Sequence, residues 1–483
     1  MRTEELHLKL DPATGGPLYL QVAAALLLPI HQGHLAPGAA LPSVRTLAAQ
    51  LDVTVNTVLA ALREIQEQGW ITSQERSGFF VAATLPALPQ DPGPNPAPAS
   101  PLGFDLPGHL APITSNANVT VDFTEGLADA RLAPAQALGR CYQRGLRLKG
   151  AELLGTRDAM GLMRLRTCLA EHLQHSRGLT AGAGQILIVR STAMAVTMVA
   201  QALVGPGGGR VAVENPGHGA LWETLRQACP AQLCGLPVDA GGARMEALEQ
   251  LLAAPGPALR LLILTPQCHF PTGVTLAPER RARLLDLARQ HRLPILELDA
   301  EFDYLPPQGP GPLASQDPGQ VLYAGSLSRA LAPGLRVSYL VSPEPLAGVL
   351  ARARQRIDWQ GDPVQEWALA ELLLEGEVQR QILRVRRAAL NRREALADAL
   401  AHGLGDLLAF DPGQAGMALW LRGQGRLAEP PRFNAWVRGC QAQGLKLRLG
   451  RHYDLDGRDL AATRLGYTAH TPEELQRAVA LMA

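Results

Sequence analysis

The chain has 483 residues, of which 47% are hydrophobic and 18% are charged, and its formal net charge is +1. This length predicts two or three domains with hydrophobic cores of their own. The near-zero net charge excludes a whole-chain electrostatic attraction for acidic or basic partners.

Cysteine spacing and hydropathy bear on the compartment. The six cysteines show no CxxC or zinc-ligand spacing, so no metal site is expected. The longest apolar stretch near the start, residues 22–30, is too short to cross a bilayer and contains Pro29. Without a signal peptide pattern, these features favour a reduced, cytoplasmic environment and no membrane partner.

The first 83 residues predict a small helical module with a hairpin. An apolar helix opens after Pro17, and two short helices follow, with Ser43 and Thr54 as their N-caps and Asp52-Val53 as the turn between them. Two short strands, around residues 70–71 and 78–81, then predict a hairpin. Two helices across a tight turn followed by a hairpin form a winged helix-turn-helix.

The spaced residues of this module resemble the GntR family. The matching text is Leu41-Pro-Ser-x-Arg45, Leu47-Ala48, Asn56-Thr57-Val58, Gly69-Trp70-Ile71 and Gly78-x-x-Val81. The resemblance implies double-stranded DNA as a partner.

The charge of the module is unusual for a DNA-binding domain. Residues 1–83 hold five basic and seven acidic side chains, a net of −2, although phosphate contacts normally require a basic excess. The family often has an arginine where this chain has Val55. The side chains expected to contact phosphates and bases are Arg45, Thr54, Asn56, Thr57 and Arg76. The alternative is that the caps and Arg45 are structural or solvated and the module serves only for docking.

A proline-rich segment separates this module from the rest. Nine prolines lie between Leu85 and Pro112. Proline fixes φ and lacks a backbone donor, so an extended linker is expected. The predicted domains are therefore residues 1–83, a linker over 84–120, and a large module over 121–483.

The large module alternates short buried strands with helical patterns. Six strands are expected at 186–189, 211–213, 261–264, 295–297, 321–323 and 337–341. Helical patterns at 193–203, 245–252 and 278–291 separate the early ones. This order predicts an α/β fold with a mostly parallel sheet covered by helices on both faces. Helices dominate from about Asp362, so a large lobe over about 135–360 and a small C-terminal lobe over 362–483 are expected.

Four motifs of this module resemble aminotransferases of fold type I. They are Val213-Glu-Asn-Pro216-Gly217, Thr265-Pro-x-x-His-Phe-Pro-Thr-Gly273, Gly325-Ser-Leu-Ser-Arg-Ala-Leu-Ala-Pro-Gly-Leu-Arg336 and Arg464-Leu-Gly-Tyr467. Together with the winged helix, the chain is similar to the MocR-type transcription regulators. That resemblance implies a pyridoxal phosphate (PLP) fold, a small-molecule effector and a head-to-tail homodimer.

One substitution changes what the resemblance implies for the cofactor. The family's Schiff-base lysine falls on Arg329, and the chain has only three lysines, Lys9, Lys149 and Lys446, all distant from this motif in sequence. A guanidinium stays protonated and does not form stable imines. We therefore expect no covalent aldimine and no catalytic residue.

Other cofactor positions have also changed. Ser191 and Thr192 stand in the family's phosphate-binding turn, where serine and threonine are also ordinary helix caps. His218 takes the ring-stacking position, although it could equally be a surface histidine. Asp299 is the candidate partner of the pyridine nitrogen, or it merely caps the strand. The acidic cluster here is two residues shorter than that of the family, and Leu298 and Ala300 stand at positions beside Asp299 where the family has functional residues.

The positions that remain are mostly cationic. Arg336, beside Ser326 and Ser328, matches the phosphate-contacting arginine, and Arg464 matches the arginine that binds a substrate carboxylate. With Arg329 they predict a site for non-covalent PLP, pyridoxamine phosphate or another small anion. The alternative is a filled pocket in which these arginines pair with neighbouring acids.

Three functions follow from this reading. The leading one is a DNA-binding transcription regulator whose aminotransferase-like domain is a catalytically inactive sensor or dimerisation domain. The second is a PLP-dependent aminotransferase that carries a fused winged helix. The third is a scaffold that binds neither DNA nor ligand.

Overall fold

A computed structural model describes residues 17–74, 77–86, 119–156, 158–306, 309–413 and 416–483. They fall into two compact units, one within Met1–Ile113 and the other within Thr114–Ala483. Most of the predicted linker, residues 87–118, lies outside the described residues.

The first unit is a winged helix, as predicted. Its elements are α1 (Leu18–His31), α2 (Val44–Leu51), α3 (Val55–Glu67), β1 (Ile71–Gln74) and β2 (Gly78–Val81). The strands pair antiparallel to form the wing. One face of each helix enters a shared core that includes Val22, Leu47 and Val58, none of which is exposed. Both predicted caps are confirmed, because Ser43 accepts from the Thr46 amide and Thr54 accepts from the Thr57 amide.

The second unit is built on an eight-stranded sheet in the order β4-β11-β10-β9-β8-β5-β6-β7. The strands are β4 (Ile186–Val189), β5 (Gly209–Asn215), β6 (Ala231–Asp239), β7 (Gly242–Ala243), β8 (Leu259–Leu264), β9 (Ile295–Asp299), β10 (Val321–Ser326) and β11 (Ser338–Val341). The neighbours from β10 to β6 pair parallel, whereas β11 runs against both of its neighbours and β7 closes a hairpin with β6. The predicted mostly parallel sheet is confirmed.

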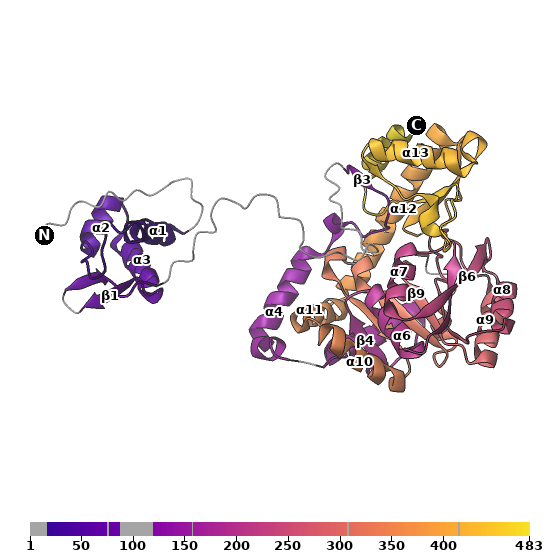
Figure 1. Cartoon of the computed structure of the whole chain (residues 1–483), viewed down its shortest axis with the longest axis horizontal. Coiled ribbons are helices and arrows are strands. Elements are labelled where there is room, and N and C mark those ends of the chain that lie inside the picture. The colour runs from indigo at the N-terminus through magenta and orange to yellow at the C-terminus, as the bar shows by residue number, and fades with distance from the viewer. Residues whose placement is uncertain (1–16, 75–76, 87–118, 157, 307–308, 414–415) are drawn as a thin grey trace. The chain divides into compact units, whose positions relative to one another are not determined.

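Helices cover both faces of this sheet (Figure 1). They are α4 (Ala135–Leu153), α5 (Met163–Arg177), α6 (Thr192–Leu203), α7 (Gly219–Ala228), α8 (Met245–Ala253), α9 (Pro278–His291), α10 (Glu344–Asp358) and α11 (Pro363–Leu374). Successive strand residues point to opposite faces. Ile186 and Ile188 therefore join the core beneath α5, α9 and α11, whereas Leu187 and Val189 join the core beneath α6 and α10.

A smaller lobe follows, with its own core. It holds α12 (Glu377–Leu404), β12 (Leu408–Ala409), β13 (Ala418–Gly423), α13 (Pro430–Ala442), β14 (Leu445–Lys446), β15 (Ala462–Gly466), α14 (Pro472–Met482) and the short strand β3 (Val121–Asp122). The expectation from the sequence was a helical lobe from Asp362. Instead, α11 packs into the large-lobe core, α12 joins the small-lobe core only from Val385 onward, and three strands form a sheet in the small lobe.

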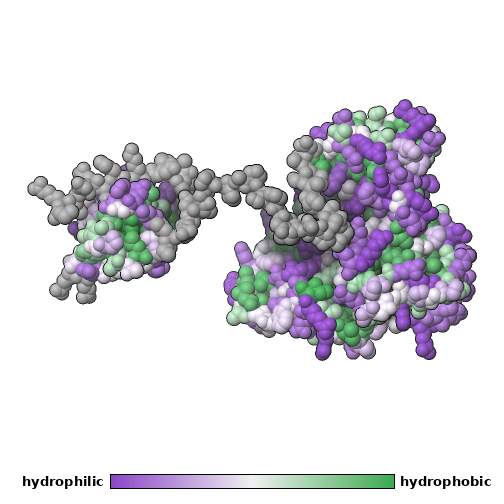
Figure 2. All heavy atoms as spheres, in the orientation of Figure 1, coloured by the Kyte–Doolittle hydropathy of each residue, from purple (hydrophilic) through white to green (hydrophobic). Residues whose placement is uncertain are grey.

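The surface gives no sign of a membrane segment in the part of the chain that the structure describes. No helix there is long and apolar enough to cross a bilayer. On the face shown in Figure 2, hydrophobic residues form separate small patches among hydrophilic ones.

Candidate functional site

The first candidate site is the start of α2 and α3 in the winged helix. Arg45 and Asn56 are both exposed, and neither makes a hydrogen bond or ion pair with another described residue. Thr54 and Thr57 are engaged in the cap, with their hydroxyl oxygens 2.9 Å apart. Arg76, the fifth predicted contact, lies outside the described residues.

The electrostatics of these helix starts suit phosphate better than the net charge of the module suggests. Neither α2 nor α3 has an acidic residue in its first turn. The partial positive charge of a helix N-terminus and its free amides are therefore available to a phosphate group.

The second candidate site is a pocket of about 340 Å³ in the other unit. It lies at the carboxyl ends of the central parallel strands, where open α/β sheets bind ligands. The strand-end residues that line it are Glu214, Leu264, Asp299 and Ser326. Arg464 on β15 lines it from the small lobe, so the pocket lies between the two lobes.

One end of the pocket is a cup at the start of α6. Ser191 is the N-cap, and its hydroxyl accepts from the Met194 amide at 3.1 Å, as the structural alternative predicts. Thr192 opens the helix and lines the pocket. Arg336 also lines it, is exposed, and has no hydrogen-bond or ion-pair partner among the described residues.

Ser326 and Ser328 shape this end through the backbone. The two hydroxyls both lie 3.2 Å from the carbonyl oxygen of Val337, and the Val337 amide donates to the Ser328 hydroxyl at 2.7 Å. They therefore fix the segment that presents Arg336, in addition to lining the pocket.

His218 is a helix cap as well as a pocket residue. Its Nδ1 accepts from the Leu221 amide at 3.3 Å, and its ring lies 4.4 Å from the Phe270 ring centroid. Burial lowers the pKa of His218 to about 4, so the imidazole is neutral at pH 7. A neutral cap of this kind presents a ring to the pocket but no charge.

Asp299 is committed to the protein interior. The Tyr323 hydroxyl donates to one carboxylate oxygen, and the Phe302 amide donates to the other at 3.0 Å. The Arg177 guanidinium lies 3.9 Å from the first oxygen. Burial raises the pKa of Asp299, and the charge of Arg177 opposes that rise. The adjoining Ala300 offers no phenol for a cofactor oxygen.

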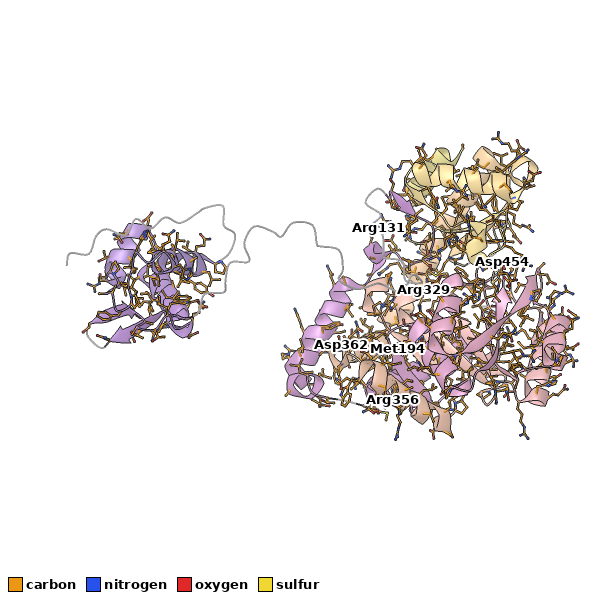
Figure 3. All side chains as sticks on the ribbon, viewed as in Figure 1. Arg131, Met194, Arg329, Arg356, Asp362 and Asp454 are labelled. Atoms are coloured by element: carbon orange, nitrogen blue, oxygen red, sulfur yellow. The ribbon has the colours of Figure 1, made fainter. Side chains whose placement is uncertain are left out.

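Arg329 lies where the two lobes meet (Figure 3). Its Nη1 donates to the carbonyl of Gly126, and its own carbonyl accepts from the Tyr304 hydroxyl at 2.8 Å. Burial lowers the pKa of Arg329, and the nearby carboxylates of Glu301 and Glu125 oppose this. An arginine nevertheless stays protonated in proteins, so a fixed positive charge occupies the position of the expected lysine.

Arg464 is already paired. Its Nη2 donates to Glu301 at 2.7 Å, and its guanidinium lies 4.5 Å from the Phe270 ring centroid. The other Glu301 oxygen accepts from the Met417 amide at 2.8 Å and from the Cys268 thiol at 3.3 Å. The Arg464 Nη1 is buried and has no hydrogen-bond partner within the described residues.

Glu301 is the functional residue that sequence reasoning missed. It follows Asp299 by two residues, and an acid buried so close to a strand end requires a cationic partner. That requirement was the available signal. Arg177 was also missed, because it comes from α5, far away in sequence.

No metal site emerges from the described residues, since they contain no group of three or more histidine, cysteine or acidic side chains suited to an ion.

Comparisons with known proteins match both units. Residues 18–81 match the family described as bacterial regulatory proteins, gntR family, and residues 127–481 match aminotransferase class I and II. The probable rhizopine catabolism regulatory protein MocR of Rhizobium meliloti is 28% identical, with 98% of this chain and 94% of that protein covered. The uncharacterized HTH-type transcriptional regulator YjiR of Escherichia coli is 30% identical, with 76% and 78% covered.

Among solved structures, the α-aminoadipate aminotransferase LysN of Thermus thermophilus superimposes with a TM-score of 0.68. The match covers 76% of this chain and 93% of that one at 24% identity, which shows the fold. Because one domain model spans most of the chain and the relatives match across both units, the chain belongs to the family of HTH-type transcriptional regulators in which a gntR-family domain precedes an aminotransferase class I and II domain.

Proposed function

We propose that this regulator binds double-stranded DNA through α2 and α3, and that its aminotransferase-like unit binds a small anion without covalent chemistry. The observation that carries the proposal is the Arg329 guanidinium in the pocket, bound to the Gly126 carbonyl. A group that cannot form an imine but holds a permanent charge favours an anion over an aldehyde.

The surroundings of Arg329 support the non-covalent reading. No lysine is among the described residues that line the pocket. Lys446 donates to Asp122 and Lys149 pairs with Glu152, so neither is directed to it. Lys9 lies outside the described residues. When bound, PLP supplies an aldehyde and an electron-withdrawing ring. This pocket fits the phosphate of that molecule and does not fit its Schiff base.

Two groups are available to an anion. At the cup, Arg336 and the first turn of α6 could hold a phosphate, with Thr192 and Ser191 beside it. At the other end, the buried Nη1 of Arg464 has its donor capacity to spare, although Nη2 is held by Glu301. Arg464 is therefore half paired, a state intermediate between the open ligand pocket and the filled pocket that the sequence leaves as alternatives.

The binding test uses pyridoxamine 5′-phosphate, which has a phosphate and no aldehyde, alongside PLP and inorganic phosphate. Calorimetry on the full chain should show saturable binding of pyridoxamine phosphate that Arg336→Ala weakens about tenfold or more, because a charge-assisted phosphate contact is lost. Arg356→Ala, an exposed arginine of α10 outside the pocket lining, is the matched control. Binding that both variants leave unchanged would rule out the cup.

The enzyme alternative has its own readout. A chain that forms a Schiff base with PLP gains a visible absorbance band, and borohydride reduction then leaves a covalent adduct on a lysine. We expect neither. A band together with turnover of an amino acid and a keto acid would establish the aminotransferase function instead.

The scaffold alternative is decided by DNA. We propose a head-to-tail homodimer that offers two winged helices, and therefore twice the phosphate contacts, which offsets the net −2 charge of residues 1–83. Retardation of duplex fragments at low salt supports this. Its absence, even at the lowest salt, would overturn DNA binding, and together with an absence of ligand binding and of aminotransferase turnover would leave the scaffold.

A further inference from the structure

The N-cap Thr54 and the first three residues of α3 fall into two groups. Thr54 and Thr57 form the cap, with Oγ1 atoms 2.9 Å apart and the Thr57 amide donating to Thr54 at 3.2 Å. Val55 and Asn56 remain exposed. In a helix-turn-helix, the N-terminal residues of the second helix face the base edges in the major groove.

Val55 contributes nothing to the core of its own module. Its side chain is 43% exposed, and it is absent from the hydrophobic cluster beneath the helices. The neighbouring Val53 packs against that cluster, and Val58 is buried within it. Val53 and Val58 stand at the positions of a hydrophobic staple, so the helix entry is already fixed without Val55.

A single exposed valine elsewhere on the surface would not indicate a function, because isolated apolar side chains are common on protein surfaces. Its position gives it meaning here. The first helical residue favours proline and acidic side chains, and valine is neither. The chain therefore places an apolar, rigid side chain beside Asn56, at an exposed position from which a helix-turn-helix reads bases.

We propose that Val55 reads the 5-methyl group of a thymine in the major groove, next to the base pair that Asn56 contacts. Thymine is the only standard base with a methyl group there, and apolar side chains recognise it by contact. The inference rests on the proposed DNA binding. It accounts for how a module with a net charge of −2 gains specificity without a further arginine.

The test begins with duplexes selected from a random library by the full-length protein. Each thymine of a selected duplex is then replaced singly by uracil, which removes only the methyl group. We expect one position in each half-site where uracil weakens binding about fourfold, the factor for withdrawing one methyl group from apolar contact.

The same scan on Val55→Ala separates this contact from others. The variant should bind the thymine duplex about fourfold more weakly and show no uracil effect at that position. Leu28→Ala, which removes an apolar side chain that is 55% exposed on α1, should keep the uracil effect intact. Unchanged thermal unfolding of Val55→Ala confirms that the module still folds.

The outcomes distinguish the two proposals. A protein that binds selected duplexes but shows a flat uracil scan, or a uracil effect that survives in Val55→Ala, overturns the role of Val55 alone. A protein that selects no duplex at low salt overturns DNA binding itself, and the role of Val55 with it.

Discussion

The Arg329 side chain holds the two lobes of its unit together through Gly126. That glycine is required, because a Cβ there would lie 2.6 Å from the Met417 Cβ and 3.3 Å from Arg464 Nη2. The tight approach brings a backbone carbonyl to the guanidinium, in a pocket where Glu301 already compensates Arg464. A carboxylate or phosphate that binds Arg329 therefore competes with the Gly126 carbonyl.

Restoring the lysine should not restore the cofactor chemistry. We expect Arg329→Lys to form little PLP adduct, because Asp299 is held by Tyr323 and Phe302 and Ala300 supplies no phenol. Visible absorbance after PLP addition, followed by borohydride reduction and mass analysis, measures the adduct. Arg356→Lys controls for surface lysine. A stoichiometric adduct on residue 329 would contradict this expectation.

Glu214 makes the stability of the large unit depend on pH. Burial raises the pKa of Glu214 from 4.5 to about 7, although the Thr265 amide and hydroxyl donate to its Oε2 at 2.8 Å. Its neighbour His269, 3.7 Å away, has a pKa lowered by burial to about 3, so the pair carries no ion-pair attraction. The folded state thus holds a proton on Glu214 that the unfolded state releases.

The sign of the effect follows from that difference. A raised carboxyl pKa favours folding below pH 4.5, and this contribution is lost as the pH rises through 7. Glu214→Gln keeps an oxygen for Thr265 and removes the titration. As the pH rises from 4.5 to 7, the unfolding free energy of Glu214→Gln should therefore increase by roughly 3 kcal/mol relative to that of the wild type. Denaturant titrations at several pH values measure this gain, and the exposed Glu246→Gln should show none.

At the scale of the elements, we expect α2 to position the duplex through phosphate contacts and α3 to read its bases. Arg45→Ala should weaken binding to all duplexes alike and reduce the slope of log K against log salt by about 1, because one phosphate contact is lost. Asn56→Ala should cost roughly 1–3 kcal/mol on the selected duplex and leave the slope unchanged. Fluorescence anisotropy at several salt concentrations distinguishes them. An identical response from both variants would place neither residue in its proposed role.

The elements that the sequence predicted best are those with local signals. Ser43 and Thr54 were identifiable as caps because hydroxyl groups before a helical pattern satisfy its free amides. Strand β6 was missed because its burial is only partial and Pro237 interrupts its pattern. Helix α7, which lies between β5 and β6, was missed with it. The sheet of the small lobe was missed because β12 has only two residues and β13 pairs with β15 across a long stretch of chain.

The residues of the candidate pocket divide in the same way, into those that a local motif identifies and those that only long-range pairing brings in. Motif positions such as Ser191, His218 and Arg464 line the pocket, as their resemblance implied. Spacing does not reveal Glu301 as the partner of Arg464, or Arg177 as the partner of Asp299, because each pairing joins elements that are distant in sequence. Whether an arginine is free or paired is therefore a property of the fold, and only Arg336 remains without a described partner in the cup.

At the scale of the whole molecule, the proposed homodimer should be measurable by light scattering. We expect a mass of twice the chain mass of 51.5 kDa at micromolar concentration. Because two winged helices share one operator in this arrangement, DNA affinity should fall steeply under dilution that dissociates the dimer. A monomeric mass with unchanged DNA affinity would contradict the arrangement.

Strand β3 determines where the second unit receives the chain from the linker. Thr120 and Phe123 donate backbone hydrogen bonds to residues 444 and 446 of the small lobe, and Gly466 donates to Phe123. The chain thus enters this unit on the small lobe, whereas the cup at the start of α6 belongs to the large lobe. Rotation of one lobe against the other along α12, whose residues enter both cores, would carry the anchor with it. The point at which the chain enters this unit would then shift relative to the start of α6 on the large lobe.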